Sequence, residues 1–233
     1  MNYLILFFLL LTIYIVGILL SKHLALHKAL VNSIFVILIG AFYLYIVLYT
    51  YIDVGPDDWN FKNTLLTANV SPFMFTTTIV MWIFPKSVRK YLLTLVSLLS
   101  FGMLVAGLGG CLDYVMRDYA FHWHIAFDCA AHVLISLWGV YLIKSGQVEL
   151  TPKRAICGGS IIVGVAIIML ILNTIFKTSF FGLSVYGDHN IYNIRIFESG
   201  VVSILVYFIG LCFVLCLGYY YQKVLSIKKN HSK

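Results

Sequence analysis

The chain has 233 residues, of which 61% are apolar and only 11% are charged, and its mean hydropathy is +0.96. Soluble domains have about 45–50% apolar and about 25% charged residues, so this composition excludes a soluble globular protein. The net charge of +7 is explained by membrane orientation and by attraction to anionic lipid headgroups. We therefore predict a polytopic membrane protein whose partners are membrane lipids, with no binding of nucleic acid.

Apolar runs long enough to cross the hydrocarbon core, which takes roughly 20 helical residues, occur seven times along the chain. The predicted helices cover residues 3–21, 30–51, 64–84, 91–111, 124–143, 155–176 and 198–221. The loops between them are short, and neither an internal repeat nor a long linker divides the chain. These features predict an all-α bundle of seven transmembrane helices that forms one domain, residues 1–233.

The basic residues fall mostly on one side of this predicted membrane map. Twelve of the 16 Lys and Arg residues lie in the first, third and fifth loops or in the C-terminal tail. The other four are Lys62, Arg117, Lys177 and Arg195. Cytoplasmic loops carry the excess of basic residues, so the pattern predicts an external N-terminus and a cytoplasmic C-terminus. The lysine bias and the short loops are typical of a bacterial plasma membrane protein.

The five cysteines show no paired CxxC spacing, and most lie within or at the ends of apolar runs. We expect no disulfide framework, no metal site and no cofactor.

Polar side chains inside a membrane are costly, and each is a candidate functional group. In the predicted helices they gather near the external side. They are Asn69, Ser71 and Thr76–Thr78 on the third helix, His124, Asp128 and His132 on the fifth, Asn173 on the sixth and Glu198 on the seventh. This distribution predicts a polar pocket in the outer half of the membrane. Glu198 has a simpler interpretation, because it can pair with Arg195 at the interface.

The fifth helix carries the strongest pattern. His124, Asp128 and His132 are four residues apart, which places them on one stripe together with Ser136 and Gly139. A carboxylate one turn from an imidazole can orient it as a general base. The stripe can equally be a hydrogen-bond cluster that holds helices together. A metal site is a third interpretation, but ligands eight residues apart on a straight helix are too distant to hold one ion.

The order of these features resembles the YwaF-like integral membrane family, which includes animal acyltransferases that act on ether phospholipids. The resemblance spans roughly residues 60–185. It lies in Ala68-Asn69-Val70-Ser71-Pro72-Phe73, in the fifth helix from Phe127 to Ile135, and in Leu172-Asn173-Thr174 at the end of the sixth. It implies that His132 corresponds to the family's active-site histidine and Asn173 to an asparagine near the end of its sixth helix.

One departure from the family lies on the third helix. Acyltransferase members are expected to carry a cysteine nucleophile there, where this chain has Ala68-Asn69 and where Ser71 is the nearest hydroxyl. Acyl chemistry would then need Ser71, one of Thr76–Thr78 or a water activated by His132.

Two functions of different classes remain open. The first is an intramembrane acyl transfer or ester hydrolysis on a lipid, with Asp128, His132 and Ser71 as catalytic residues. Asn69, His124, Asn173 and Glu198 would then bind the substrate. The second is a non-enzymatic protein that uses the same pocket to bind or transport a small solute, a lipid or protons.

Overall fold

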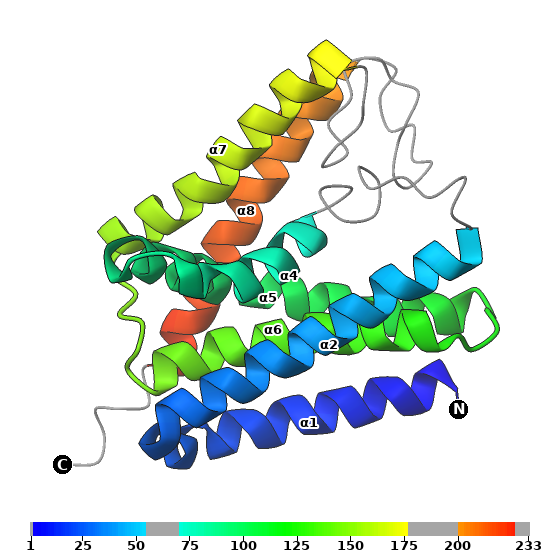
Figure 1. Ribbon diagram of the computed structural model, residues 1–233, viewed down its shortest axis with the longest axis horizontal. Coiled ribbons are helices and arrows are strands. Elements are labelled where there is room, and N and C mark those ends of the chain that lie inside the picture. Colours follow the sequence, from blue (N-terminus) through cyan, green and yellow to red (C-terminus); the bar gives the residue numbers. More distant parts are fainter. Residues whose placement is uncertain (1, 55–69, 177–199, 227–233) are drawn as a thin grey trace.

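The described part of the chain is built from helices alone. The computed structural model describes residues 2–54, 70–176 and 200–226, and no β-strand occurs within them. The elements are α1 (Tyr3–Leu24), η1 (Ala25–His27), α2 (Lys28–Val54), α4 (Val70–Val80), η2 (Met81–Ile83), α5 (Lys86–Met116), α6 (Trp123–Lys144), α7 (Pro152–Phe176) and α8 (Gly200–Ser226), where η marks a 3-10 helix (Figure 1). The all-α class predicted from the sequence is confirmed for these residues.

Several of these helices are suited to a membrane. Within the described ranges, five stretches are long and apolar enough to cross one: Tyr3–Tyr49, Lys86–Met116, Trp123–Lys144, Pro152–Ile175 and Ile204–Ser226. The first stretch contains both α1 and α2, which are joined by η1 (Figure 1). The shorter Val70–Ile83 is the described part of the third predicted span. The apolar helices indicate a multi-pass membrane protein, and the count of seven crossings stays a prediction.

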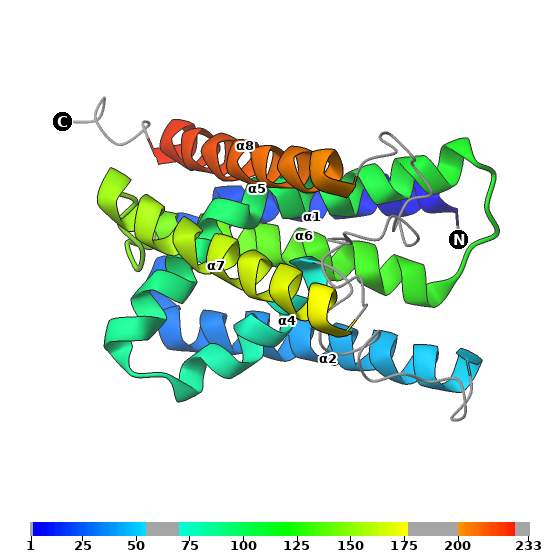
Figure 2. The same cartoon turned by 90° about the horizontal axis from the view of Figure 1, so that it is seen from above.

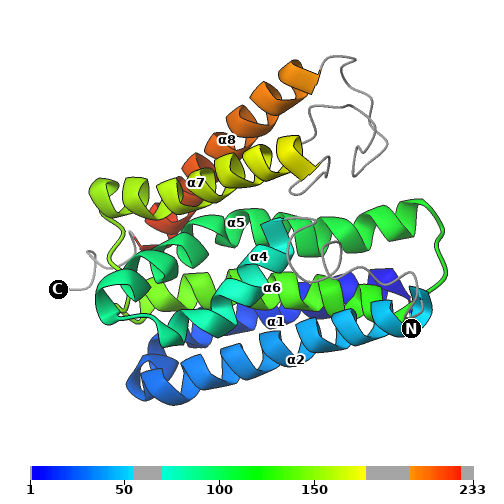
Figure 3. The ribbon, with the colours of Figure 1, turned by 45° about the horizontal axis from the view of Figure 1, so that its top comes forward.

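Helix α6 lies in the middle of the bundle. Of its most apolar stretch 72% is buried inside the protein, against 22% for α7 and 11% for α8. The pair α7 and α8 lies on one side of α5 and α6, and the pair α1 and α2 lies on the other (Figures 1 and 3). Most of α6 is therefore surrounded by protein, whereas the apolar outer helices are left to face lipid.

Glycines bring α5 close to its neighbours. A Cβ atom on Gly139 of α6 would lie 2.8 Å from the Ser100 Cβ and 2.9 Å from the Val96 carbonyl oxygen of α5. A Cβ on Gly218 of α8 would overlap the backbone carbonyl of Leu98. In lipid there is no hydrophobic drive between helices, so close packing at small residues supplies much of their association. The missing side chains therefore allow α6 and α8 to pack tightly on α5.

An arginine fixes α4 relative to α5. Nη2 of Arg89, near the start of α5, donates to the carbonyl oxygens of Trp82 and Phe84, both at 2.9 Å. The guanidinium carbon also lies 5.1 Å from the centre of the Trp82 ring, which is a cation–π distance. The turn that follows α4 is thus tied to the start of α5.

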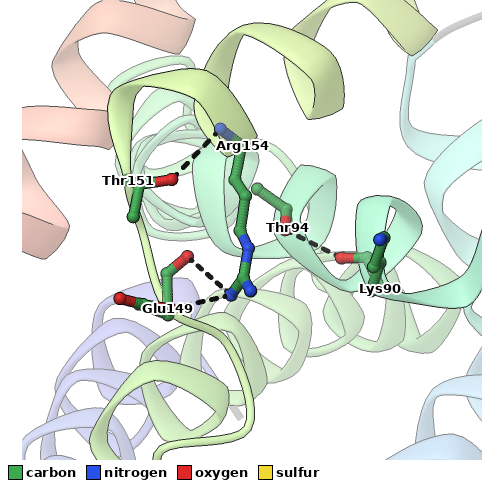
Figure 4. A network of polar contacts seen from close by, with 5 residues as sticks. All are labelled: Lys90, Thr94, Glu149, Thr151 and Arg154. Atoms are coloured by element: carbon green, nitrogen blue, oxygen red, sulfur yellow. Dashed lines mark hydrogen bonds and ion pairs between the residues drawn. The ribbon is translucent and has the colours of Figure 1, made fainter. Parts of the chain in front are cut away.

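The connection between α6 and α7 contains a small polar network (Figure 4). The Arg154 amide donates to Thr151 Oγ1 at 3.3 Å, which caps α7 just before its first residue, Pro152. The Arg154 guanidinium lies 3.2 Å from the Glu149 carboxylate, with 43% and 72% of the two side chains exposed. Exposed pairs of this kind contribute only about 0–1 kcal/mol, so the cap is the feature that sets where α7 begins.

Candidate functional site

The imidazole of His132 connects α6 to α4. Its Nε2 lies 2.7 Å from Ser71 Oγ. Its Nδ1 lies 2.7 Å from the backbone carbonyl oxygen of Asp128 and 3.5 Å from the Asp128 carboxylate. The structure therefore brings together the three residues that the sequence singled out as catalytic, with Ser71 coming from α4 and the other two from α6.

These contacts determine where the proton on the neutral imidazole lies. A carbonyl oxygen can only accept a hydrogen bond, so Nδ1 of His132 must be the donor to Asp128. Nε2 then carries a lone pair and accepts the hydrogen bond of the Ser71 hydroxyl. A histidine in this tautomer beside a serine hydroxyl has the geometry of a general base beside a nucleophile.

Local helix geometry explains why these residues meet. Asp128 and His132 are one turn apart on α6, and Ser71 and Phe75 are one turn apart on α4. The Phe75 ring meets the His132 ring edge to face, with 5.3 Å between the centroids and 81° between the planes. The Phe75 ring also packs against the ring of Tyr43 on α2, with 5.3 Å between the two centroids. The imidazole is thus held by one polar and one aromatic residue of the same α4 face.

The two ionisable groups of the site differ in exposure. Only 8% of the His132 side chain is exposed, against 47% of the Asp128 side chain. A carboxylate that faced hydrocarbon would be costly, and such groups in membrane proteins usually face the bundle interior or a water-filled space. The exposure of Asp128 therefore indicates that a polar molecule or water can reach the site from that side.

Two of the three threonines that follow Ser71 on α4, Thr76 and Thr78, have other partners. Thr78 Oγ1 donates to the Met74 carbonyl oxygen at 2.8 Å, a bond within α4. The Thr76 hydroxyl is hydrogen-bonded to Tyr43. Among the hydroxyls of residues 70–80, Ser71 is the one with a described hydrogen bond to His132, which narrows the choice of nucleophile that the sequence left open.

Two of the four predicted substrate-binding residues, His124 and Asn173, lie in the described part of the chain. His124 stacks on Tyr49 of α2, with centroids 4.4 Å apart, and lies eight residues or about 12 Å from His132 along α6. Asn173 is 1% exposed near the end of α7, a helix that packs mainly on α5. Asn69 and Glu198 lie outside the described residues. A role for these four residues in binding stays a prediction.

Ser136, one turn after His132 on the predicted stripe, belongs to a different hydrogen-bond network. Ser136 is fully buried and donates to the Tyr14 hydroxyl of α1 at 3.1 Å. That hydroxyl is in turn hydrogen-bonded to the hydroxyl of Tyr221 on α8. The stripe therefore divides between two networks: Asp128 and His132 contact α4, whereas Ser136 joins α6 to α1 and α8.

Two residues near the site were missed by sequence reasoning. Phe75 could have been found from its spacing, because a residue four positions after Ser71 shares its helix face. Gly107 of α5 belongs to Gly107-Leu108-Gly109-Gly110, a glycine-rich run of the kind that permits close helix approach. A Cβ atom there would lie 2.8 Å from the Cys129 carbonyl oxygen and 3.1 Å from the His132 Cβ, so this glycine sets how closely α5 approaches the histidine.

Gly107→Ala therefore has a defined expected effect. The added methyl group would force α5 and α6 apart, and we expect a loss of about 1–3 kcal/mol in the free energy of unfolding. Gly109→Ala is the matched control, since no atom lies within 4 Å of a Cβ at that position. It should be neutral or stabilise the helix by up to about 1 kcal/mol. Thermal unfolding in detergent measures both, and equal midpoints for the two variants would contradict the close approach of α5 to His132.

Comparisons of the chain with protein-family models, curated proteins and solved structures found no match. The resemblance to the YwaF-like family therefore stays a prediction, and the function has to be inferred from the geometry of the site.

Proposed function

We propose that this protein is an integral membrane enzyme that performs ester hydrolysis or acyl transfer on a lipid, with Ser71 as nucleophile and His132 as general base. The observation that carries the proposal is the hydrogen bond between Ser71 Oγ and His132 Nε2, together with the bond from Nδ1 to the Asp128 carbonyl oxygen. A serine hydroxyl is a weak nucleophile by itself, and an adjacent imidazole of this tautomer is what activates it.

The reaction follows from these positions. Ser71 Oγ attacks the carbonyl carbon of an ester while its proton passes to His132 Nε2, and the alcohol of the ester leaves with that proton. Water or an acceptor alcohol then attacks the acyl-serine and gives its own proton to Nε2, which passes that proton to the leaving Ser71 Oγ, so that a fatty acid or a new ester is released and the free serine is restored. The Asp128 carboxylate, 3.5 Å from Nδ1, stabilises the imidazolium formed in each half of the reaction.

The surroundings of Ser71 favour a lipid substrate. The face of α4 that carries Ser71 also carries the buried apolar side chains of Met74 and Phe75. The half-exposed Asp128 carboxylate marks the polar side of the site. An acyl ester has both an apolar chain and a polar carbonyl, which suits this combination.

The proposal is compatible with the YwaF-like resemblance in one specific way. Ala68-Asn69 of this chain corresponds to the position where acyltransferase members are expected to carry a cysteine. The serine that we propose as the nucleophile, Ser71, lies two residues after Asn69. We infer an oxygen nucleophile and an ester intermediate instead of a thioester. Asn69, Asn173, His124 and Glu198 remain candidates for binding the substrate.

We further propose seven membrane crossings, with the N-terminus outside and the C-terminus in the cytoplasm of a bacterial cell. The support is the charge asymmetry of the loops. In this arrangement the connection between α5 and α6 is external, and the connection between α6 and α7, with its Arg154 and Glu149 pair, is cytoplasmic.

Reporter fusions test this topology. Green fluorescent protein fluoresces only in the cytoplasm and alkaline phosphatase is active only outside, so each fusion site gives opposite signals on the two sides. We expect a fusion after Ser226 and one at Gly146 to fluoresce, and a phosphatase fusion at Ala120 to be active. Phosphatase activity at Gly146 or after Ser226 would contradict the orientation.

Labelling with a fluorophosphonate tests the chemistry, because this probe reacts with activated serines. We expect purified full-length protein to be labelled, and Ser71→Ala and His132→Ala to lower the labelling rate at least about a hundredfold. Asp128→Asn should have a smaller effect, since its backbone carbonyl still holds Nδ1 of His132.

Ser160→Ala is the matched control for this experiment. Ser160 is exposed on α7, and its hydroxyl donates to the Ile156 carbonyl oxygen at 2.8 Å within that helix. The control should label like the wild type, and all variants should elute as folded protein in size-exclusion chromatography. Folded wild type without labelling, or labelling that persists in Ser71→Ala, would contradict a serine mechanism.

The alternative function, transport or binding without chemistry, has one observation in its favour. The hydroxyls of Ser136, Tyr14 and Tyr221 form a partly buried chain that starts one helical turn from His132. A histidine inside a membrane protein is a typical member of a proton relay, and such a chain could extend it. If labelling fails, proton uptake into proteoliposomes, compared between wild type and Tyr14→Phe, becomes the relevant measurement.

A further inference from the structure

A separate cavity lies at the end of the bundle where α1 begins and α5 ends, a position that Figures 1 and 2 show beside the N-terminus. Its volume is about 260 Å³. Its walls include four aromatic rings and two polar side chains, those of Tyr3, Tyr114, Tyr119, Phe121, Asn2 and Asp118. None of these residues takes part in the contacts of His132.

The rings form a connected row. Tyr3 contacts Phe121 and Tyr114 with 5.1 Å between centroids in each pair, and Tyr114 contacts Tyr119 at 5.5 Å. The planes are turned by 27° to 52° from one ring to the next. The four rings therefore form one continuous aromatic wall, and an aromatic ring carries negative potential on its face.

Backbone contacts of the α5–α6 connection fix this wall. The Tyr3 hydroxyl accepts a hydrogen bond from the His122 amide at 3.0 Å and lies 3.3 Å from the Ala120 carbonyl oxygen, to which it donates. Asp118 has a φ of 52°, in the left-handed region that Asp and Asn tolerate better than other residues with side chains. Its amide donates to the Val115 carbonyl oxygen at 3.2 Å. The connection is thus anchored to α1 and to the end of α5.

The charges around the cavity leave one carboxylate available. The guanidinium of Arg117 lies 2.9 Å from the Asp113 carboxylate, and hydrogen bonds to Asp113 and to Tyr119 raise the pKa of Arg117. Arg117 is therefore engaged by Asp113 and by Tyr119, one ring of the cavity wall. No Lys, Arg or His forms an ion pair with Asp118 within residues 2–54, 70–176 and 200–226.

We propose that this cavity binds an organic ammonium group, such as the trimethylammonium of choline. Aromatic walls attract quaternary ammonium ions through cation–π interactions, and a carboxylate at the rim supplies the opposite charge. Pockets for drug-sized ligands measure roughly 300–1,000 Å³, so a cavity just below that range suits a headgroup or a small cation. The ammonium can belong to a zwitterionic lipid or to a free solute, and the binding chemistry is the same.

The test compares choline with 3,3-dimethyl-1-butanol, which has the same shape but no charge. Saturation-transfer NMR on full-length protein in maltoside detergent detects the methyl protons of either probe. We expect choline to bind and the neutral alcohol to bind at least about fivefold more weakly, as the loss of a cation–π contact and a charge pair implies.

Two variants remove the proposed contacts without disturbing the core. Asp118→Asn removes the charge while keeping a residue that tolerates a positive φ. Tyr119→Ala removes a ring that is 53% exposed, and its matched control is Tyr220→Ala on α8, where the ring is 63% exposed. Choline binding should weaken about fivefold or more in the first two variants and stay unchanged in the control.

A second arm distinguishes the source of the ammonium group. Native mass spectrometry counts the phosphatidylcholine and the diacylglycerol molecules that the protein retains. Retention of phosphatidylcholine that is lost in Asp118→Asn identifies a lipid headgroup site, whereas choline binding alone identifies a free solute. Equal binding of choline and the neutral alcohol, wild-type binding in both cavity variants, or no binding in either arm would overturn the proposal. None of these outcomes depends on the chemistry of Ser71.

Discussion

Each polar group of a buried membrane helix needs a partner inside the protein, and α6 is the helix on which this requirement acts most strongly. It is the most buried of the five candidate spans in the described ranges. Along its length His132 contacts Ser71, Ser136 contacts Tyr14, and the Trp138 indole donates to Asn32 Oδ1 at 3.0 Å. These bonds hold α4, α1 and α2 against α6, so one helix organises the packing of three others.

The same requirement links packing to chemistry at His132. Its Nδ1 is occupied by a carbonyl of its own helix, which leaves Nε2 facing a hydroxyl of a different helix. The position of that hydroxyl depends on α4, and α4 is fixed by the bonds from Arg89 to the carbonyls of Trp82 and Phe84. The pairing of Ser71 with His132 therefore depends on the turn at the C-terminal end of α4. It also depends on Gly107, which lets α5 approach α6.

Sequence reasoning could predict the features that depend on composition and on spacing within one helix. The helical class and the shared face of Asp128 and His132 follow from apolar run length and from a four-residue spacing. Contacts between helices are not fixed by such patterns. The pairing of Ser71 with His132 spans 61 positions, and sequence could nominate both residues but not their distance. The hydrogen bonds that join Ser136 to Tyr14 and Tyr14 to Tyr221 likewise depend on how the helices cross. The same is true of the close approach of α5 to α6 at Gly107.

The most direct measurement of the central claim is the protonation of the two nitrogens of His132. Full-length protein labelled with ¹⁵N-histidine gives separate NMR signals for protonated and unprotonated ring nitrogens, and a His132→Gln sample identifies the signals of this residue. The geometry predicts that neutral His132 carries its proton on Nδ1, and that the signal of the unprotonated Nε2 shifts in Ser71→Ala as its hydrogen bond is lost. A proton on Nε2 would make His132 a donor to Ser71, and a general base at this position would be contradicted.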